Sequence, residues 1–186
     1  EELDAHHGEL LKFGGDALTA FFHEAALGPA HAALAAGAAL TMQRRMQAFA
    51  ALQTPAGVHQ LRLRVGVHSG QVFAAQVGDA GHVELVVTGG DISRVAQAQD
   101  VAEPGETVIS AEARAVGAGA DTIERREGFF LLRGLPLALP PAPAPAGAHA
   151  FADAPPTMAH VLALAEQIAA LRPFLPYRLS RRFLTS

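Results

Sequence analysis

A glycine pair followed by an aspartate, Gly14-Gly15-Asp16, lies between two short apolar segments. This pattern is typical of a tight β-hairpin whose tip carries the carboxylate. Mg²⁺ prefers oxygen ligands and often takes some of them from substrate phosphates, and glycines let a phosphate approach the backbone. Asp16 is therefore a candidate metal ligand, and Gly14 and Gly15 are candidates for the phosphate approach. The alternative is an ordinary hairpin turn with a solvated carboxylate, and this segment alone leaves both open.

The elements that would position this hairpin follow from the spacing of apolar residues. A helix is expected where the apolar residues recur every three or four positions, and a half-buried strand where they alternate. Asp91 is a candidate N-cap of the second long helix, and Ser110 is a candidate N-cap of a brief one. The predicted elements are a hairpin over 9–22, a helix over 29–53 begun by Pro29, strands over 61–67, 71–77 and 83–88, a helix over 91–102, a strand over 107–109, a helix over 110–116 and a hairpin over 122–132.

These elements predict an α+β sandwich, an antiparallel sheet with helices on one face. A βαββαβ sheet needs one more strand and helix before Glu9, while residues 1–8 resemble only the end of such a helix. We therefore expect the domain to begin upstream of this chain. The domain is predicted to span 1–135, followed by a Pro- and Ala-rich linker over 136–157 and a helical segment with its continuation over 158–186.

Composition excludes several classes of protein. Half of the 186 residues are hydrophobic and 17% are charged, as in ordered globular domains. The net charge of −4 and the lack of a basic cluster argue against nucleic acid as a partner. The absence of cysteine excludes disulfides and thiolate metal sites. The Ala-rich run over 30–40 is too short for a membrane span and no signal peptide is apparent, so we expect a cytoplasmic protein.

Four segments, in this order, resemble the catalytic domain of class III nucleotide cyclases. They are residues 12–18 (KFGGDAL), 65–70 (VGVHSG), 87–93 (VTGGDIS) and 102–110 (AEPGETVIS). The resemblance covers about residues 3–135 and is strongest to the first catalytic domain of the soluble, bicarbonate-responsive adenylyl cyclases. Residues 171–176 resemble the lead-in to the second domain of those enzymes.

The resemblance implies a ferredoxin-like cyclase sandwich that is truncated at its N-terminus. It also implies conversion of ATP to cyclic AMP and pyrophosphate, with two Mg²⁺ (or Mn²⁺) ions held by two aspartates. Only Asp16 matches one of these aspartates, so we expect the chain alone to be inactive. A second cyclase domain, in the same chain or as a dimer partner, would complete the site.

Two positions that hold charge and ribose in the family are altered here. Ser93 and Gln97 stand where the family has an Asn and an Arg one helical turn apart, and Val86 stands where many adenylyl cyclases read adenine with a polar side chain. Loss of one such electrostatic contact to the transition state costs about 3 kcal/mol. The retained Asp16 and the altered Ser93 and Gln97 together predict the metal-supplying half of a two-domain site.

Lys12 and Arg94 match the residues that bind bicarbonate in the soluble cyclases, and a guanidinium suits a small planar anion. Without the resemblance, both side chains would be interpreted as ordinary surface charges. Two other functions remain open: a catalytically silent pseudocyclase that binds an anion or nucleotide and regulates a partner, and, less favoured, a diguanylate cyclase. The nine histidines form no zinc-peptidase pattern and are interpreted as incidental.

Overall fold

The computed structural model describes residues 2–79, 82–118 and 121–135. The predicted linker and the helical segment after it lie outside these ranges. The described residues divide into two units, residues 2–71 with 89–135, and the hairpin of residues 72–88.

The larger unit is built on a four-stranded sheet in the order β5-β8-β10-β9. The strands are β5 (Val65–Val67), β8 (Thr107–Ser110), β9 (Asp121–Arg126) and β10 (Phe129–Gly134). β8 is buried along its whole length. β5 pairs with β8 in parallel, and the other pairs are antiparallel. Because a parallel pair requires a crossover, the chain between these two strands passes through the helix α4 (Gly90–Val101).

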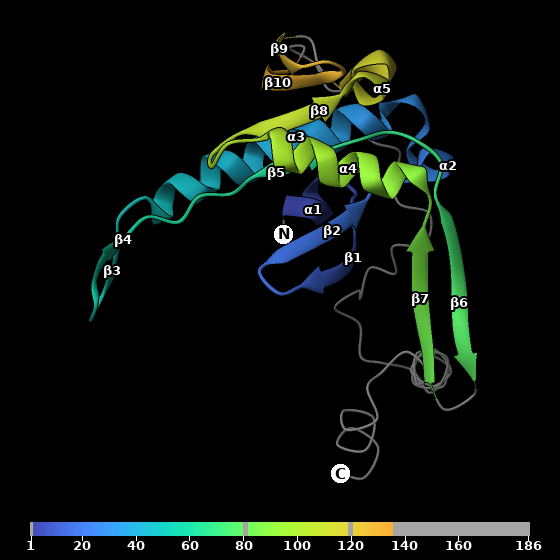
Figure 1. Ribbon diagram of the computed structural model, residues 1–186, viewed down its shortest axis with the longest axis horizontal. Coiled ribbons are helices and arrows are strands. Elements are labelled where there is room, and N and C mark those ends of the chain that lie inside the picture. Colours follow the sequence, from blue (N-terminus) through green and yellow to red (C-terminus); the bar gives the residue numbers. More distant parts are fainter. Residues whose placement is uncertain (1, 80–81, 119–120, 136–186) are drawn as a thin grey trace, which may run out of the picture. The chain divides into compact units, whose positions relative to one another are not determined.

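Helices cover both faces of β8 (Figure 1). Ile109 packs with alanines of α3 (His31–Met46), and its neighbour Val108 packs with Ala98 and Ala102 at the end of α4. Successive side chains of a strand point to opposite faces, so the two helices lie on opposite sides. The α+β class is confirmed, but the sheet contains one parallel pair, and these helices do not share the single face that we predicted.

The first long helix begins and ends differently from the prediction. The short helix α2 (Glu24–Leu27) and a 3-10 turn precede α3, and a second 3-10 turn ends at Phe49. The hairpin of β3 (Leu52–Thr54) and β4 (Gly57–His59) then follows, although the helix was expected to reach residue 53. Thr54 stabilises this turn, because its Oγ1 donates to the Gly57 carbonyl and accepts from the Ala56 amide.

The stretch Glu24–Phe49 is long and apolar enough to cross a membrane by length and composition alone. Half of its most apolar window is buried within the fold, as in the core helix of a globular domain. Ala32, Ala36 and Ala39 of α3 pack against Val67 and Ile109 of the sheet. This contact accounts for the alanine-rich composition, since small side chains let the helix approach the strands closely.

The strand predicted over 61–67 is paired only at Val65–Val67. The preceding residues bond elsewhere: the Leu61 amide donates to the Phe49 carbonyl, and the Gln43 side chain donates to the Leu63 carbonyl. The alternation of apolar and polar residues therefore begins before the paired strand, in residues 61–64 that form no part of the sheet. The final hairpin of β9 and β10 and the brief helix α5 (Ala111–Ala113), capped by the Ser110 hydroxyl, confirm the predictions. A π-helical turn over Arg114–Ala118 follows α5.

The N-terminal part of this unit has the predicted hairpin, formed by β1 (Glu9–Gly14) and β2 (Ala17–Phe21), after a short helix α1 (Glu2–Ala5). Gly14 pairs with Ala17, so Gly15 and Asp16 make a two-residue turn. Gly15 has φ of +67°, a conformation that glycine adopts at little cost. The sequence thus predicted both strands and their turn correctly.

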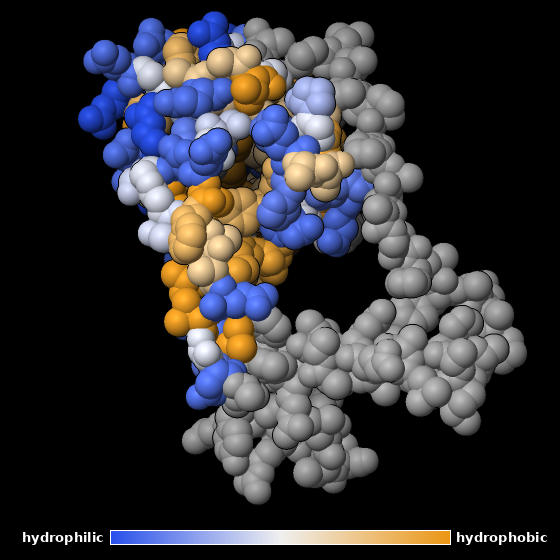
Figure 2. Space-filling view, turned by 90° about the vertical axis from the view of Figure 1, so that its right-hand side faces the viewer, coloured by the Kyte–Doolittle hydropathy of each residue, from blue (hydrophilic) through white to orange (hydrophobic). Residues whose placement is uncertain are grey.

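The second unit is a hairpin of β6 (Phe73–Asp79) and β7 (His82–Thr88), close to the predicted strands. Phe73, Val77 and Val86 share one face, since cross-strand partners point to the same side, and all three are exposed. Leu85 on the other face is also exposed. Figure 2 shows this apolar surface in orange. A two-stranded hairpin with apolar residues on both faces has too little core to be stable by itself.

Candidate functional site

Asp16 is exposed at the tip of the β1–β2 hairpin. No atom outside the neighbouring residues lies within 4 Å of the positions that a Cβ would take at Gly14 and Gly15, so the backbone there is open to a ligand. Within the described ranges, no group of three or more His, Asp or Glu side chains is placed to hold a metal. The structure therefore offers one accessible carboxylate beside open backbone, and not a closed metal site.

Ser93 and Gln97 are exposed on α4, one helical turn apart. Neither side chain carries charge. The Gln97 carboxamide oxygen accepts a long hydrogen bond of 3.4 Å from Nη1 of Arg94. The helix thus places both uncharged residues one turn apart and exposed, with the Arg94 guanidinium beside Gln97.

Arg94 is held by contacts within its own domain. Its Nη2 lies 3.3 Å from Oε1 of Glu112, and its guanidinium carbon lies 4.5 Å from the centre of the Phe129 ring. The Glu112 carboxyl has a lowered pKa, chiefly because it accepts a hydrogen bond from its own backbone amide, with smaller contributions from Ser110 and Arg94. Lys12 is exposed on β1. The bicarbonate pair of Lys12 and Arg94 stays a prediction, because it requires both cations to reach one anion and not to contact each other.

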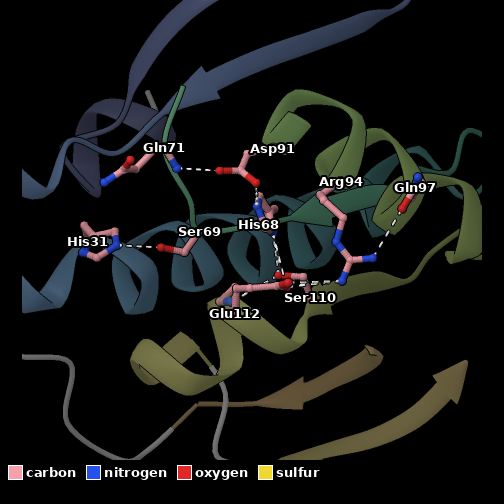
Figure 3. A network of polar contacts seen from close by, with 10 residues as sticks. His31, His68, Ser69, Gln71, Asp91, Arg94, Gln97, Ser110 and Glu112 are labelled. Carbon is pink, nitrogen blue, oxygen red and sulfur yellow. Dashed lines mark hydrogen bonds and ion pairs between the residues drawn. The ribbon is translucent and has the colours of Figure 1, made fainter. Parts of the chain in front are cut away.

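A polar network in this region centres on His68, which follows β5 (Figure 3). Its side chain is 4% exposed, and its Nδ1 lies 2.8 Å from Oγ of Ser110. Its Nε2 lies 3.2 Å from Oδ1 of Asp91, although this contact is not aligned as a hydrogen bond. Oε2 of Glu112 lies 3.6 Å from Nδ1. His68 therefore joins the end of β5 to α4 and α5 and is not incidental.

Asp91 does not cap α4, which corrects the sequence prediction. The N-cap is Gly89, with φ of +134°. The Asp91 carboxylate instead accepts a 2.6 Å hydrogen bond from the Gln71 amide through Oδ2 and faces His68 through Oδ1. Gly70 makes room for this arrangement, because a Cβ there would overlap the carboxylate.

Ser110, His68 and Asp91 follow one another as nucleophile, base and acid do in hydrolases. Ser110, however, is 0% exposed, and its Oγ accepts the Ala113 amide as the cap of α5. A buried hydroxyl committed to a helix cap cannot attack a substrate. The network is structural, and the sequence held a signal for it. His68 directly follows a half-buried strand at a Ser-Gly turn, where an imidazole can reach two neighbouring elements.

Comparisons with known proteins show the family and the fold of this chain. Residues 1–136 match the family described as adenylate and guanylate cyclase catalytic domain. Adenylate cyclase 1 of Rhizobium meliloti is 25% identical over 126 residues, which are 68% of this chain and 19% of that protein. The chain thus spans about a fifth of the length of this curated relative.

Several solved structures share the fold. The guanylyl cyclase Cya2 superposes with a TM-score of 0.60 at 18% identity, covering 77% of this chain and 78% of its own. The adenylyl cyclase CyaB from P. aeruginosa gives a TM-score of 0.55 at 17% identity, with coverages of 72% and 76%. The guanylate cyclase domain of RhGC from Catenaria anguillulae, solved with GTP, gives 0.55 at 20% identity, with coverages of 70% and 72%.

Proposed function

Since the chain belongs to the adenylate and guanylate cyclase catalytic domain family, we propose that it is the metal-supplying half of a two-domain adenylyl cyclase. The complete site converts ATP to cyclic AMP and pyrophosphate, with the ribose 3′-hydroxyl attacking the α-phosphate. The observation that carries this proposal is Asp16, an exposed carboxylate beside the open backbone of Gly14 and Gly15. The match includes the segments downstream of this hairpin, which favours a class III cyclase over a diguanylate cyclase.

Asp16 would hold Mg²⁺ or Mn²⁺ together with oxygens of the ATP phosphates. Its donor chemistry fits a hard divalent cation, which is commonly bound by one or two carboxylates and substrate phosphates. When bound, two such ions stabilise the negative charge on the attacking and leaving oxygens. The rest of the metal site must come from groups other than the described residues of this chain.

The second cyclase domain supplies what α4 lacks. Ser93 and Gln97 can donate hydrogen bonds but provide no positive charge for the transferred phosphoryl group. Val86 on β7 offers no hydrogen bond to adenine. The division of labour of a soluble-type cyclase, with metals on the first domain and base and phosphate contacts on the second, accounts for all three residues. A cytoplasmic location remains a prediction.

The proposed bicarbonate response requires one further step. Arg94 contacts Glu112, so an anion that binds Arg94 with Lys12 must compete with that carboxylate. Bicarbonate binding would therefore involve release of Glu112 from Arg94.

A second candidate function is a catalytically silent cyclase domain that regulates its partner. The observation in its favour is that no group of three or more His, Asp or Glu side chains among the described residues is placed to hold a metal, while Ser93 and Gln97 are uncharged. Such a module would bind its partner and a nucleotide or bicarbonate without turnover.

The test is an assay of cyclic AMP from this chain, with the residues that precede it in the parent protein, mixed with a second cyclase domain that carries the Asn and Arg. Asp16→Asn is expected to lower turnover at least a hundredfold. The matched control is Glu127→Gln, an exposed carboxylate at the turn between β9 and β10. Activity that is unaffected by Asp16→Asn removes the metal assignment, and nucleotide binding without any cyclic AMP favours the silent module.

A further inference from the structure

The β6–β7 hairpin leaves the larger unit after Gln71 and returns to it at Gly89. These two ends are tied to each other near the point of exit. The Gln71 amide donates to Oδ2 of Asp91 at 2.6 Å, and Asp91 is the second residue of α4 after the returning strand. The carboxylate thereby closes the base of the hairpin with a charge-assisted hydrogen bond, which is stronger than a neutral one.

His68 holds this carboxylate from the opposite side (Figure 3). The imidazole is fixed, since its side chain is 4% exposed and Nδ1 lies 2.8 Å from the Ser110 hydroxyl. With the proton on Nε2 facing Asp91, Nδ1 accepts the Ser110 O–H, while Ser110 Oγ accepts the Ala113 amide. Nε2 lies 3.2 Å from Oδ1 of Asp91 without the alignment of a hydrogen bond, so the imidazole limits the position of Asp91 by close packing, while the Gln71 amide fixes it by a hydrogen bond.

The backbone at Gly70 approaches His68 and Asp91 too closely for any side chain to fit there. A Cβ at Gly70 would lie 2.7 Å from Nε2 of His68 and would also overlap Asp91. The turn between β5 and the hairpin is therefore packed directly on the His68–Asp91 contact. A backbone packed this tightly against a buried imidazole resists bending at that point.

The hairpin itself is the segment that most needs a partner. Phe73, Val77 and Val86 expose one apolar face, and Leu85 is exposed on the other. On the proposed function, on which this inference rests, the partner is the second cyclase domain. A hairpin whose attachment to the larger unit is flexible binds its partner with lower affinity, because binding must then restrict its orientation at a cost in entropy.

We propose that Asp91 and His68 are positioning residues, a clamp that fixes the base of the β6–β7 hairpin so that it docks productively on the second cyclase domain. Glu112, which contacts Arg94, lies on the Nδ1 side of His68 with Oε2 3.6 Å from that nitrogen, whereas Asp91 lies on the Nε2 side. The clamp affects the association of the two cyclase domains, which precedes the reaction of ATP.

Substitutions of different chemistry can distinguish loss of the clamp from a general loss of stability. Asp91→Ala removes both contacts. Asp91→Asn retains an oxygen for the Gln71 amide and turns an N–H₂ toward Nε2 of His68, which accepts when the proton moves to Nδ1. Asparagine is thus expected to rescue the clamp and alanine is not. Gln43→Ala is the stability control, because Gln43 donates from α3 to the carbonyls of Leu63 and Glu106 and has no part in the clamp.

The experiment uses the full chain and measures two quantities without ATP, the dissociation constant for the second cyclase domain and amide hydrogen exchange over residues 71–79 and 82–88. Asp91→Ala and His68→Ala are expected to weaken assembly at least tenfold and to speed exchange at Gln71 and along the hairpin. Asp91→Asn is expected to stay within about threefold of the wild type. Gln43→Ala is expected to lower the melting temperature without weakening assembly.

Three results overturn the clamp: assembly that Asp91→Ala leaves unchanged, equal weakening by Gln43→Ala at matched stability, or no assembly of the wild type with the second domain. Failure of the proposed function is distinguishable, because the wild-type complex would then assemble, respond to the clamp variants and produce no cyclic AMP.

Discussion

The Arg94 guanidinium lies over the ring of Phe129, with its central carbon 4.5 Å from the ring centre, while Nη2 contacts Glu112 at 3.3 Å. This arrangement joins α4 to α5 and β10. Arg94, which the sequence assigned to a bicarbonate site, is thus already paired with the Glu112 carboxylate. The two uses of Arg94 compete, and the competition can be measured.

If Arg94 binds bicarbonate, Glu112→Gln should lower the bicarbonate concentration needed for half-maximal stimulation of the assembled cyclase, because the neutral amide competes less for the guanidinium. Arg94→Ala should abolish stimulation and retain basal turnover. Titration of cyclic AMP formation against bicarbonate measures both. Stimulation that Arg94→Ala leaves intact would place the bicarbonate site elsewhere.

The lowered pKa of Glu112 predicts a pH dependence of stability. A carboxyl group with a depressed pKa in the folded state stabilises the fold above its unfolded pKa, and this contribution is lost as the pH falls through the folded pKa. The free energy of unfolding of the wild type should therefore fall more steeply than that of Glu112→Gln below the ordinary value of 4.5. Urea unfolding at several pH values checks this, and the effect should be small because the side chain is 49% exposed.

The sequence predicted the elements with strong local signals. The Gly-Gly-Asp turn, the Ser110 cap and the final hairpin follow from turn and cap chemistry within a few residues, and all three are present. The family resemblance is confirmed by the match over residues 1–136. The placement of Asp16 at an exposed tip could thus be predicted, whereas its metal remains a prediction.

Long-range relationships could not be predicted from these patterns. The parallel pairing of β5 with β8 depends on a crossover that alternation does not encode. Asp91 had the right type and place for an N-cap, but the Gln71 amide and His68 compete for its carboxylate, and both are brought there by tertiary packing. Arg94 and Lys12 matched a family pair by position, while Glu112, which contacts Arg94, lies 18 residues further along the chain.

Gly66 should be intolerant of any side chain. A Cβ there would lie 2.5 Å from the Gln99 amide nitrogen and 2.6 Å from the Val95 carbonyl oxygen, which are backbone atoms of α4 and cannot rotate away. Gly66→Ala is expected to lower the free energy of unfolding by about 1–3 kcal/mol or more. Gly90→Ala is the control, since no atom lies near its Cβ position, and it should be neutral. Equal melting temperatures for both variants would contradict the packing of α4 on β5.

Removal of the two hydroxyls at the ends of β8 should change the free energy of unfolding differently. Ser110 Oγ accepts the Ala113 amide and lies 2.8 Å from Nδ1 of His68, so Ser110→Ala removes a cap and a buried partner together. We expect this change to lower the free energy of unfolding by about 1–3 kcal/mol.

Thr107 Oγ1 is also buried, but it has no hydrogen-bond partner among the described residues. A buried hydroxyl without a partner has lost its hydration and gained nothing in exchange, so Thr107→Val, which keeps the shape of the side chain, should be neutral or stabilise the fold by about 1 kcal/mol. Chemical denaturation of both variants in parallel measures the contrast. A loss of stability on Thr107→Val as large as that on Ser110→Ala would mean that the threonine hydroxyl has a bonded partner in solution.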